Sequence, residues 1–236
     1  MHYLRSNKCS LFRRMNFAKS GKWGGFINLK YAPYILLLLL FSCAPKAYKN
    51  LQQAEGNAEC LQKFQPNFQR ALYRATVDVT GNHLSGLLLI KQMPDSSTRL
   101  LFTNEAGFKF FDFEFSETGD FKVHSIIDKM DKEAVKKTLH KDFKLILFNK
   151  PVTVLKPYKF KEQSATENYY AWNEGEDFYY YITNTDCTQL LRMERGSSTK
   201  KVLEAFSGGI KDGVPDSIKI HHTNFNFDIS LVRIYD

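Results

Sequence analysis

Alternating apolar and polar residues predict two hairpins in the first half of the chain. Between residues 71 and 79 every odd position is apolar, and positions 74, 76 and 78 are Arg, Thr and Asp. This period of two is typical of a strand with one buried face. The turn signal Thr80-Gly81-Asn82 leads into an apolar run at 84–90, and a second pair of runs follows at 99–103 and 108–115. We therefore expect four antiparallel strands before residue 116.

Residues 131–148 change the period from two to about 3.6. Asp131 is a suitable N-cap, and Pro151 ends the pattern, so we expect one amphipathic helix here. Five lysines cover the rest of its surface, either as a solvated face or as a contact for anionic lipid. The apolar stripe consists of Val135, Leu139, Phe143, Ile146 and Leu147.

The pattern returns to strands after the helix. Five short runs precede a terminal hairpin that turns near Thr223 and Asn224. One helix cannot cover both faces of a sheet of about 10–11 strands, so the sheet must curl on itself. We expect a mainly β (α+β) fold, a strongly curved open antiparallel β-barrel with the helix packed against its mouth. The five runs are 153–155, 168–172, 178–183, 189–194 and 200–206.

The first 42 residues have the order of a secretory signal peptide. Basic residues precede an apolar run at 34–42, which is shorter than the roughly 20 residues of a membrane-spanning helix. Leu40-Phe41-Ser42-Cys43 resembles a bacterial lipobox, which implies lipidation of Cys43 and removal of residues 1–42. Translation from Met15 would give a leader of more ordinary length. The alternative is an uncleaved amphipathic anchor with an incidental cysteine.

The mature chain would then have two parts. Residues 43–68 read as a lipidated amino terminus and polar tether with one helical turn around 51–61, and residues 69–236 form the domain. Several acyl chains on Cys43 would hold the protein at a membrane almost permanently. The first acidic residue after Cys43 is Glu55, and the lack of an acidic cluster favours the periplasmic face of the outer membrane.

The formal charge of +8 is concentrated in the leader. The chain has 33 Lys and Arg against 25 Asp and Glu, and residues 1–42 contain seven of the basic residues and no acidic one. The remaining 26 basic and 25 acidic residues leave residues 43–236 close to neutral. Such a body lacks the sustained positive field that phosphate binding needs, so we expect no nucleic-acid partner.

Two cysteines besides the anchor remain in the mature chain, Cys60 and Cys187. In an oxidising compartment an even pair is a candidate disulfide, with two buried thiols as the alternative. Neither cysteine belongs to a Cys-x-x-Cys pair, which argues against a metal or redox site.

The inward-facing positions of the predicted sheet are rich in large aromatic residues. One interpretation is a core filled by its own side chains. The other is a cavity that binds an acyl chain, because a barrel of this size can leave room for one small ligand. The candidate lining residues are Phe102, Phe111, Phe113, Phe115, Tyr170, Trp172, Tyr179, Tyr181 and Phe227.

One hairpin resembles a known family. Residues 99–107, Arg-Leu-Leu-Phe-Thr-Asn-Glu-Ala-Gly, and the alternating residues 111–115, Phe-Asp-Phe-Glu-Phe, resemble the third-to-fourth-strand hairpin of the LolA/LolB family of outer-membrane lipoprotein carriers and receptors. The order of lipobox, tether, four strands, amphipathic helix and further strands is also similar. The resemblance implies an incomplete antiparallel barrel whose apolar cavity binds acyl chains.

The same resemblance implies a functional hairpin tip. In LolB this tip carries a protruding leucine thought to help pass cargo into the membrane, whereas the matching position here is Ala106. The resemblance therefore supports the fold more directly than lipoprotein insertion. The tip consists of Glu105, Ala106, Gly107 and Phe108.

The sequence contains no recognisable catalytic motif, such as Gly-x-Ser-x-Gly or His-Glu-x-x-His. His221 and His222 are adjacent on a predicted strand, so they point to opposite faces and are expected to be solvated rather than to share a metal. Asp112 and Glu114 share a strand face, where exposed carboxylates are more ordinary than an acid–base pair. Residues 212–216 are expected to form a turn. We expect no enzymatic activity, no cofactor and no metal site.

Two functions remain. The first is a monomeric lipoprotein that binds acyl chains as a receptor, carrier or chaperone in lipid or lipoprotein trafficking. Its expected partners are the membrane, through the lipid on Cys43, the acyl chains of lipids or lipidated proteins, and a periplasmic LolA-like carrier. The alternative is a non-catalytic structural or assembly lipoprotein that uses the same fold as a protein-binding platform.

Overall fold

The structure, a computed structural model, describes residues 47–161 and 166–235. These residues belong to the compact unit Pro45–Asp236. The predicted signal peptide 1–42 and Cys43 lie outside the described residues.

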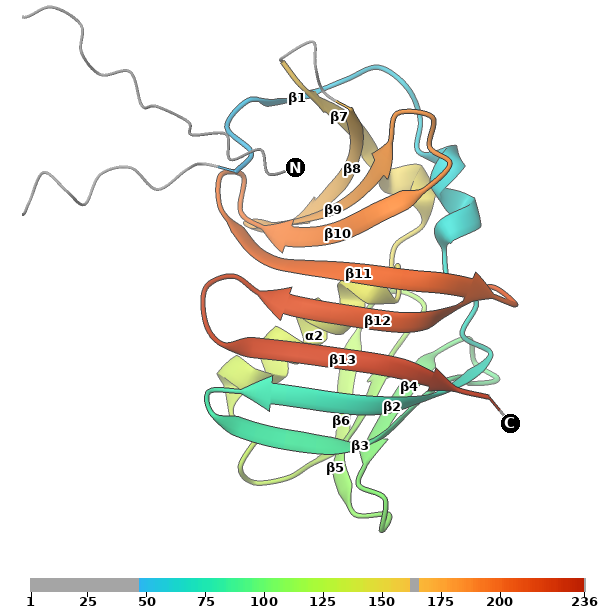
Figure 1. Cartoon of the computed structure of the whole chain (residues 1–236), viewed down its shortest axis with the longest axis vertical. Coiled ribbons are helices and arrows are strands. Elements are labelled where there is room, and N and C mark those ends of the chain that lie inside the picture. The colour runs from blue at the N-terminus through green and yellow to red at the C-terminus, as the bar shows by residue number, and fades with distance from the viewer. Residues whose placement is uncertain (1–46, 162–165, 236) are drawn as a thin grey trace, which may run out of the picture. The chain divides into compact units, whose positions relative to one another are not determined.

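Thirteen strands in the described residues form one antiparallel sheet, in the order β1-β7-β8-β9-β10-β11-β12-β13-β2-β3-β4-β5-β6 (Figure 1). The order begins with β1 and ends with β6, so the sheet is open, as the sequence predicted. The strands are β1 (Leu51–Gln53), β2 (Arg70–Val79), β3 (Asn82–Gln92), β4 (Thr98–Thr103), β5 (Lys109–Phe115), β6 (Phe121–Ile126), β7 (Lys156–Phe160), β8 (Glu167–Glu174), β9 (Asp177–Asn184), β10 (Leu190–Gly196), β11 (Lys201–Lys211), β12 (Val214–His222) and β13 (Phe227–Ile234).

Three details of the strand prediction differ from the structure. β1 and β6 were not expected, because each is short and weakly apolar. The expected strand at 153–155 is displaced: η4, a short 3-10 helix at Val152–Val154, is followed by β7. The terminal hairpin and the turn between β11 and β12 are confirmed, and Asp212 and Gly213 form the latter with φ of 54° and 74°.

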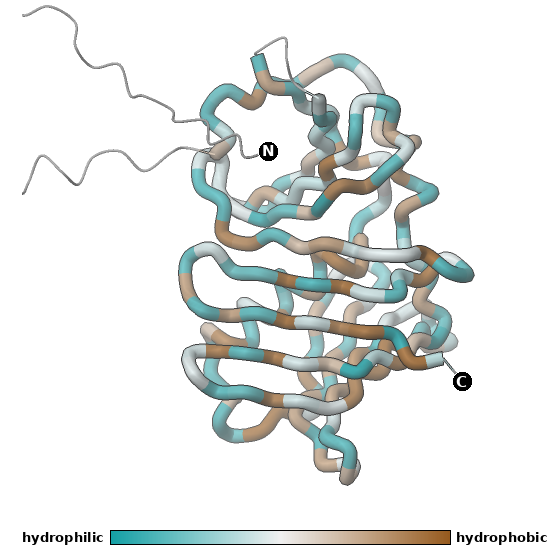
Figure 2. Tube along the Cα trace, viewed as in Figure 1, coloured by the Kyte–Doolittle hydropathy of each residue, from teal (hydrophilic) through white to brown (hydrophobic). Residues whose placement is uncertain are grey.

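Alternation along the strands separates an inner from an outer face. β2 alternates buried and more exposed positions from Ala71 to Val77, and its register with β13 pairs Val77 with Ile229 and Ala75 with Leu231. All four side chains are buried. The same alternation of hydrophobic and hydrophilic residues is visible along β12 and β13 in Figure 2. The inner face of the sheet is therefore the wall of the main core.

Helix α2 (Glu133–Ile146) packs against this inner face, and Figure 1 shows it behind the strands β12, β13 and β2. Its stripe of apolar side chains, including Leu139 and Phe143, belongs to the main core. The predicted N-cap Asp131 was wrong. Lys132 precedes the helix with no side-chain cap, because the Asp131 carboxylate pairs with Lys136 at 2.8 Å.

The segment expected to act as a tether packs against the domain from Tyr48 onward. Tyr48 is 4% exposed, stacks on Tyr180 with a centroid distance of 4.3 Å, and donates a 2.6 Å hydrogen bond to Glu194. Burial and the neighbouring Glu194 raise the pKa of Tyr48, so the hydroxyl stays neutral. β1 pairs with β7. Tyr48 and β1 therefore cover the outer face of β8 and β9. This cover explains why each of these two strands contains a run of consecutive buried residues rather than an alternation.

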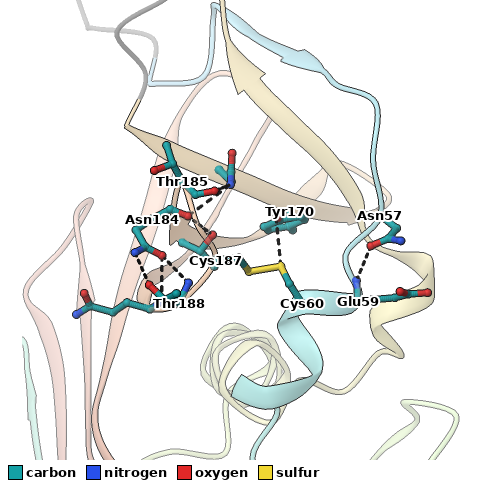
Figure 3. The surroundings of a disulfide bond; sticks show 11 residues. Asn57, Glu59, Cys60, Tyr170, Asn184, Thr185, Cys187 and Thr188 are labelled. Carbon is teal, nitrogen blue, oxygen red and sulfur yellow. Dashed lines mark hydrogen bonds between the residues drawn. A yellow bond between two sulfur atoms is a disulfide. The ribbon is translucent and has the colours of Figure 1, made fainter.

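A disulfide joins η3 (Glu59–Phe64) to the β9–β10 turn. The helical turn expected around 51–61 thus lies further along the chain, because residues 51–53 form β1. Cys60 and Cys187 are bonded with a Cα–Cα distance of 6.2 Å (Figure 3). The side chain of Asn184 accepts a 2.8 Å hydrogen bond from the Thr188 backbone N–H and holds the turn. The Tyr170 hydroxyl donates to the Cys60 sulfur at 3.3 Å. The candidate disulfide is thus formed in the structure.

Candidate functional site

A cavity of about 360 Å³ lies between the inner face of the sheet and α2. Most of its wall is apolar. The sheet contributes Ala75, Val77, Val79, Leu84, Leu88, Phe102, Phe111, Phe227, Ile229 and Leu231. The helix and the loop before it contribute Met130, Ala134, Val135, Thr138, Leu139 and Phe143.

The exposed lining residues define the cavity mouth. They come from the β2–β3 turn, from the β12–β13 turn, and from the start of α2 with its preceding loop, three segments on one side of the sheet in Figure 1. Small side chains help to leave the space open, since Ala75 faces the interior from β2 and Ala134 lies on the first turn of α2. The cavity mouth consists of Thr80, Asn82, Lys129, Lys132, Ala134 and Phe225.

Three of the nine candidate lining residues, Phe102, Phe111 and Phe227, line this cavity. The other six are buried but outside its wall: Phe113, Phe115, Tyr170, Trp172, Tyr179 and Tyr181.

The last turns of α2 fill the space near the aromatic residues of β8 and β9. The Tyr181 hydroxyl donates a 3.1 Å hydrogen bond to the Leu145 carbonyl, and its ring packs on Phe148 with centroids 4.1 Å apart. Trp172 stacks on Tyr179 at 4.2 Å. Burial raises the pKa of both Tyr179 and Tyr181 above the usual value. Aromatic rings and the end of α2 thus fill this part of the interior, whereas the cavity lies beside β2, β3 and β13.

Aromatic rings also fill the space between α2 and the strands β5 and β6, at the end of β5 and the start of β6. Phe113 packs against Phe121 with centroids 5.0 Å apart, and Phe115 lies 5.6 Å from the ring of His140 on α2. His140 stacks on Phe121 at 4.4 Å. Burial, together with the charge of Lys144, lowers the pKa of His140.

A buried ionic network fixes α2 to the sheet. Asp142 of α2 accepts hydrogen bonds from Arg195 of β10 at 2.9 Å and from His222 of β12 at 2.8 Å. All three residues are nearly fully buried, with 0%, 5% and 2% exposure. The His222 ring stacks on Phe227, a lining residue, at 4.8 Å. The network thereby sets the position of the helix that closes the cavity.

Two expectations about charged residues were wrong. His222 is buried rather than solvated, because a carboxylate 80 residues earlier in the chain meets it inside the fold. His221 does point to the opposite, exposed face, where it contacts Asp228 at 2.6 Å. Asp112 is 3% exposed, because Arg99 on the adjacent strand binds both of its carboxylate oxygens at 2.7 and 2.9 Å.

The environment of Asp112 keeps it charged. Burial acts to raise the pKa of Asp112, but the hydrogen bonds and charge of Arg99, together with Lys109 and His124, outweigh burial and lower it. Asp112 is therefore one half of a structural ion pair. Glu114, the other carboxylate on this strand face, binds His124 instead.

The hairpin tip lies at the end of β4 and β5, in the part of the chain that resembles the LolA/LolB hairpin. Glu105, Ala106 and Gly107 are exposed, and the Phe108 side chain is exposed to 59%. The Asn104 side chain accepts a 2.8 Å hydrogen bond from the Phe108 backbone N–H. The tip therefore presents an aromatic ring to solvent two residues after Ala106.

The described residues contain neither a candidate metal site nor a candidate membrane-spanning helix. Within residues 47–161 and 166–235, no group of three or more His, Cys, Asp or Glu residues is placed to hold a metal ion. Over the same residues, no helix has both the length and the apolar character needed to cross a membrane.

Comparison with known proteins finds similarity only at the level of structure. No family model matches the sequence, and no curated protein matches it. A LolA superfamily protein from Nitrosomonas europaea has 8% identity and a TM-score of 0.48, covering 77% of this chain and 93% of that one. A DUF1329 family protein from Desulfovibrio piger has 10% identity and a TM-score of 0.41, with coverages of 74% and 88%.

A third similar structure, from Vibrio parahaemolyticus, is described as an outer membrane lipoprotein-sorting protein domain. It has 7% identity and a TM-score of 0.42, and the match covers 76% of this chain and 90% of that one. The solved structures similar to this chain thus include LolA superfamily and lipoprotein-sorting proteins, the group that the hairpin at 99–115 resembles. With TM-scores below 0.5, the function has to be argued from the cavity itself.

Proposed function

We propose that this protein is a lipid-anchored protein of the bacterial envelope that binds an acyl chain in the cavity between α2 and the sheet. It would act without covalent chemistry, as a receptor or carrier in lipid or lipoprotein trafficking at the periplasmic face of the outer membrane. The observation that carries the proposal is the largely apolar cavity of about 360 Å³ between α2 and the sheet.

The size and lining of the cavity favour a hydrocarbon chain. Ligand cavities in proteins usually measure about 300–1,000 Å³, so this one suits a single chain. Each methylene group moved from water into an apolar wall contributes about 0.8 kcal/mol. The lining contains few groups that could orient a polar ligand, and these lie mostly at the cavity mouth.

The envelope location is proposed from the leader. The lipobox-like residues at 40–43 would place acyl chains on Cys43, and a protein anchored in this way is positioned to exchange lipid with the same membrane. Phe108 at the exposed hairpin tip supplies an apolar side chain that could touch a lipid surface.

A binding titration with a filled-cavity variant tests the proposal. The compact unit Pro45–Asp236 contains every described strand and helix, and it would be titrated with a dansyl-labelled fatty acid while emission is measured. Ala134→Trp places an indole at the cavity mouth on an exposed helix position, so we expect binding to weaken by about tenfold or more, because the ring occupies space needed by the chain.

Lys137→Trp is the matched control, since Lys137 is exposed on the same helix and outside the cavity lining. It should bind the probe as the unmodified protein does. Absence of binding to the unmodified protein would contradict the proposal and favour the protein-binding platform. Equal binding by both tryptophan variants would place the probe elsewhere on the protein.

A further inference from the structure

The charges at the cavity mouth are all of one sign. The lining contains two charged residues, Lys129 and Lys132, and no acidic residue. Both lysines are exposed. An apolar cavity with only positive charge at its opening discriminates among the head groups that a bound chain could carry, because the head group must stay at the opening when the chain is buried.

These two lysines form no ion pair within the described residues, although carboxylates are close in sequence. Asp131 and Glu133 both bind Lys136, at 2.8 and 2.6 Å, a lysine that does not line the cavity. Asp128 is exposed and does not line the cavity. Neither lysine at the opening is therefore held in an ion pair by these neighbouring acidic side chains, and both ammonium groups are available to a ligand.

Carboxylates of the two adjacent turns are also paired away from the lysines. On the β2–β3 side Asp78 contacts His83 at 2.6 Å, and on the β12–β13 side Asp228 contacts His221 at 2.6 Å. The remaining polar groups of the cavity mouth, Thr80 and Asn82, are uncharged. No described carboxylate that borders these segments is thus paired with Lys129 or Lys132.

We propose that the cavity binds an amphiphile with a single alkyl chain and an anionic head group, with the head group at Lys129 and Lys132. The inference rests on the proposed function, since it specifies the ligand of the same cavity. The shared chemistry is an anion on one chain, which either a free fatty acid or a monoacyl phospholipid with a phosphate head group supplies. A cavity of about 360 Å³ favours one chain over the several chains of a lipoprotein amino terminus.

The test compares ligands that share a chain and differ in the head group. Myristate, lysophosphatidic acid with the same chain, and methyl myristate would be titrated against the Pro45–Asp236 protein by isothermal calorimetry below their micelle concentrations. We expect both anions to bind about tenfold more tightly than the neutral ester at low salt. Because the head group is exposed to solvent, this preference should shrink as salt is added.

A double variant assigns the preference to the two lysines. In Lys129→Gln/Lys132→Gln the anions should lose their advantage while the ester binds as before, because the apolar wall is unchanged. Lys137→Gln removes one positive charge from the same helix outside the lining and should retain most of the advantage. Binding of myristate but not of lysophosphatidic acid would identify a free fatty acid as the source of the anion, and the reverse result would identify a monoacyl phospholipid.

The outcomes separate this inference from the proposed function. Equal affinity for the anions and the ester, or a preference that survives in the double variant, would overturn the inference and leave acyl-chain binding intact. Failure of all three ligands to bind would overturn both. Loss of ester binding in the double variant would also contradict the inference, since it would show that the lysines act on the cavity rather than on the head group.

Discussion

Asp142 illustrates how single residues determine the shape of this cavity. Its carboxylate lies between Arg195 and His222, fully buried. A charge removed from water is tolerated only when its partners compensate for the lost hydration. The three residues come from α2, β10 and β12, so their pairing ties the helix to two strands that are distant in sequence.

Removing this carboxylate should destabilise the protein strongly. Asp142→Ala leaves the Arg195 guanidinium buried, and among the described residues Asp177, at 3.4 Å, is its remaining ionic partner. We expect the free energy of unfolding to fall by about 3–5 kcal/mol, as for other broken buried ion pairs. Urea unfolding followed by circular dichroism measures the loss.

Asp177→Ala provides the comparison, because Asp177 contacts both Arg195 and Lys141 from a partly exposed position. Its loss should cost about 1 kcal/mol or less. Similar losses for Asp142→Ala and Asp177→Ala would show that burial does not decide the strength of this network.

The sequence alone could not identify Asp142 and His222 as buried partners. Asp142 occupies a polar position of an amphipathic helix, and His222 follows another histidine on a strand. Both patterns are typical of solvated side chains. Only the meeting of three segments separated by up to 80 residues makes them buried partners, and neither periodicity nor spacing carries that information. For Phe111, by contrast, its place in the alternating pattern of residues 111–115 was sufficient to predict that its side chain faces the interior.

At the scale of elements, alternation and helical periodicity predicted most of the fold. The hairpin of β2 and β3, the helix α2 and the terminal hairpin follow directly from these patterns. The prediction failed where a contact with another element decides the structure. β1 is a strand because β7 offers its edge, and its three residues, Leu51, Gln52 and Gln53, have no alternation of their own.

The disulfide should stabilise the docking of η3 on the sheet. It connects two positions separated by 127 residues, and a cross-link that closes so long a loop restricts the unfolded chain strongly. Replacing both Cys60 and Cys187 by alanine should lower the free energy of unfolding by about 2–5 kcal/mol. Thermal unfolding of the two proteins, each with and without dithiothreitol, measures the effect.

Dithiothreitol should lower the melting temperature of the unmodified protein to near that of the double alanine variant and leave the variant unaffected. A melting temperature that does not respond to dithiothreitol or to the substitution would contradict the prediction. It would indicate that the buried Leu61 of η3, which is 0% exposed, holds this segment without help.

For the whole molecule, the open curved sheet was predictable but the position of the hollow was not. The argument that one helix cannot cover a large sheet needs only the number of strands. The position of the cavity depends on the summed volumes of the side chains on two facing walls. Here the walls include Ala75 on β2 and the first turns of α2. Six of the nine aromatic residues that the sequence suggested as lining instead fill other parts of the interior, because their rings pack against one another and against α2.

An apolar cavity of limited volume makes a prediction about chain length. If acyl chains enter the cavity, affinity should rise by about fourfold for each added methylene, which corresponds to about 0.8 kcal/mol. The rise should stop at the length that fills the cavity, because further methylenes remain in water. Calorimetric titration of saturated fatty acids of increasing length, each below its micelle concentration, gives both the slope and the break.

The position of the break distinguishes the cavity from a surface patch. Val135→Phe enlarges a partly buried side chain of the lining and should move the break to a shorter chain without changing the slope before it, since the remaining wall is still apolar. An affinity that rises without a break in both proteins would mean that the chains lie along the exterior. A break that stays at the same length in Val135→Phe would mean that something other than the volume beside α2 sets the limit, and the cavity would then not be the binding site.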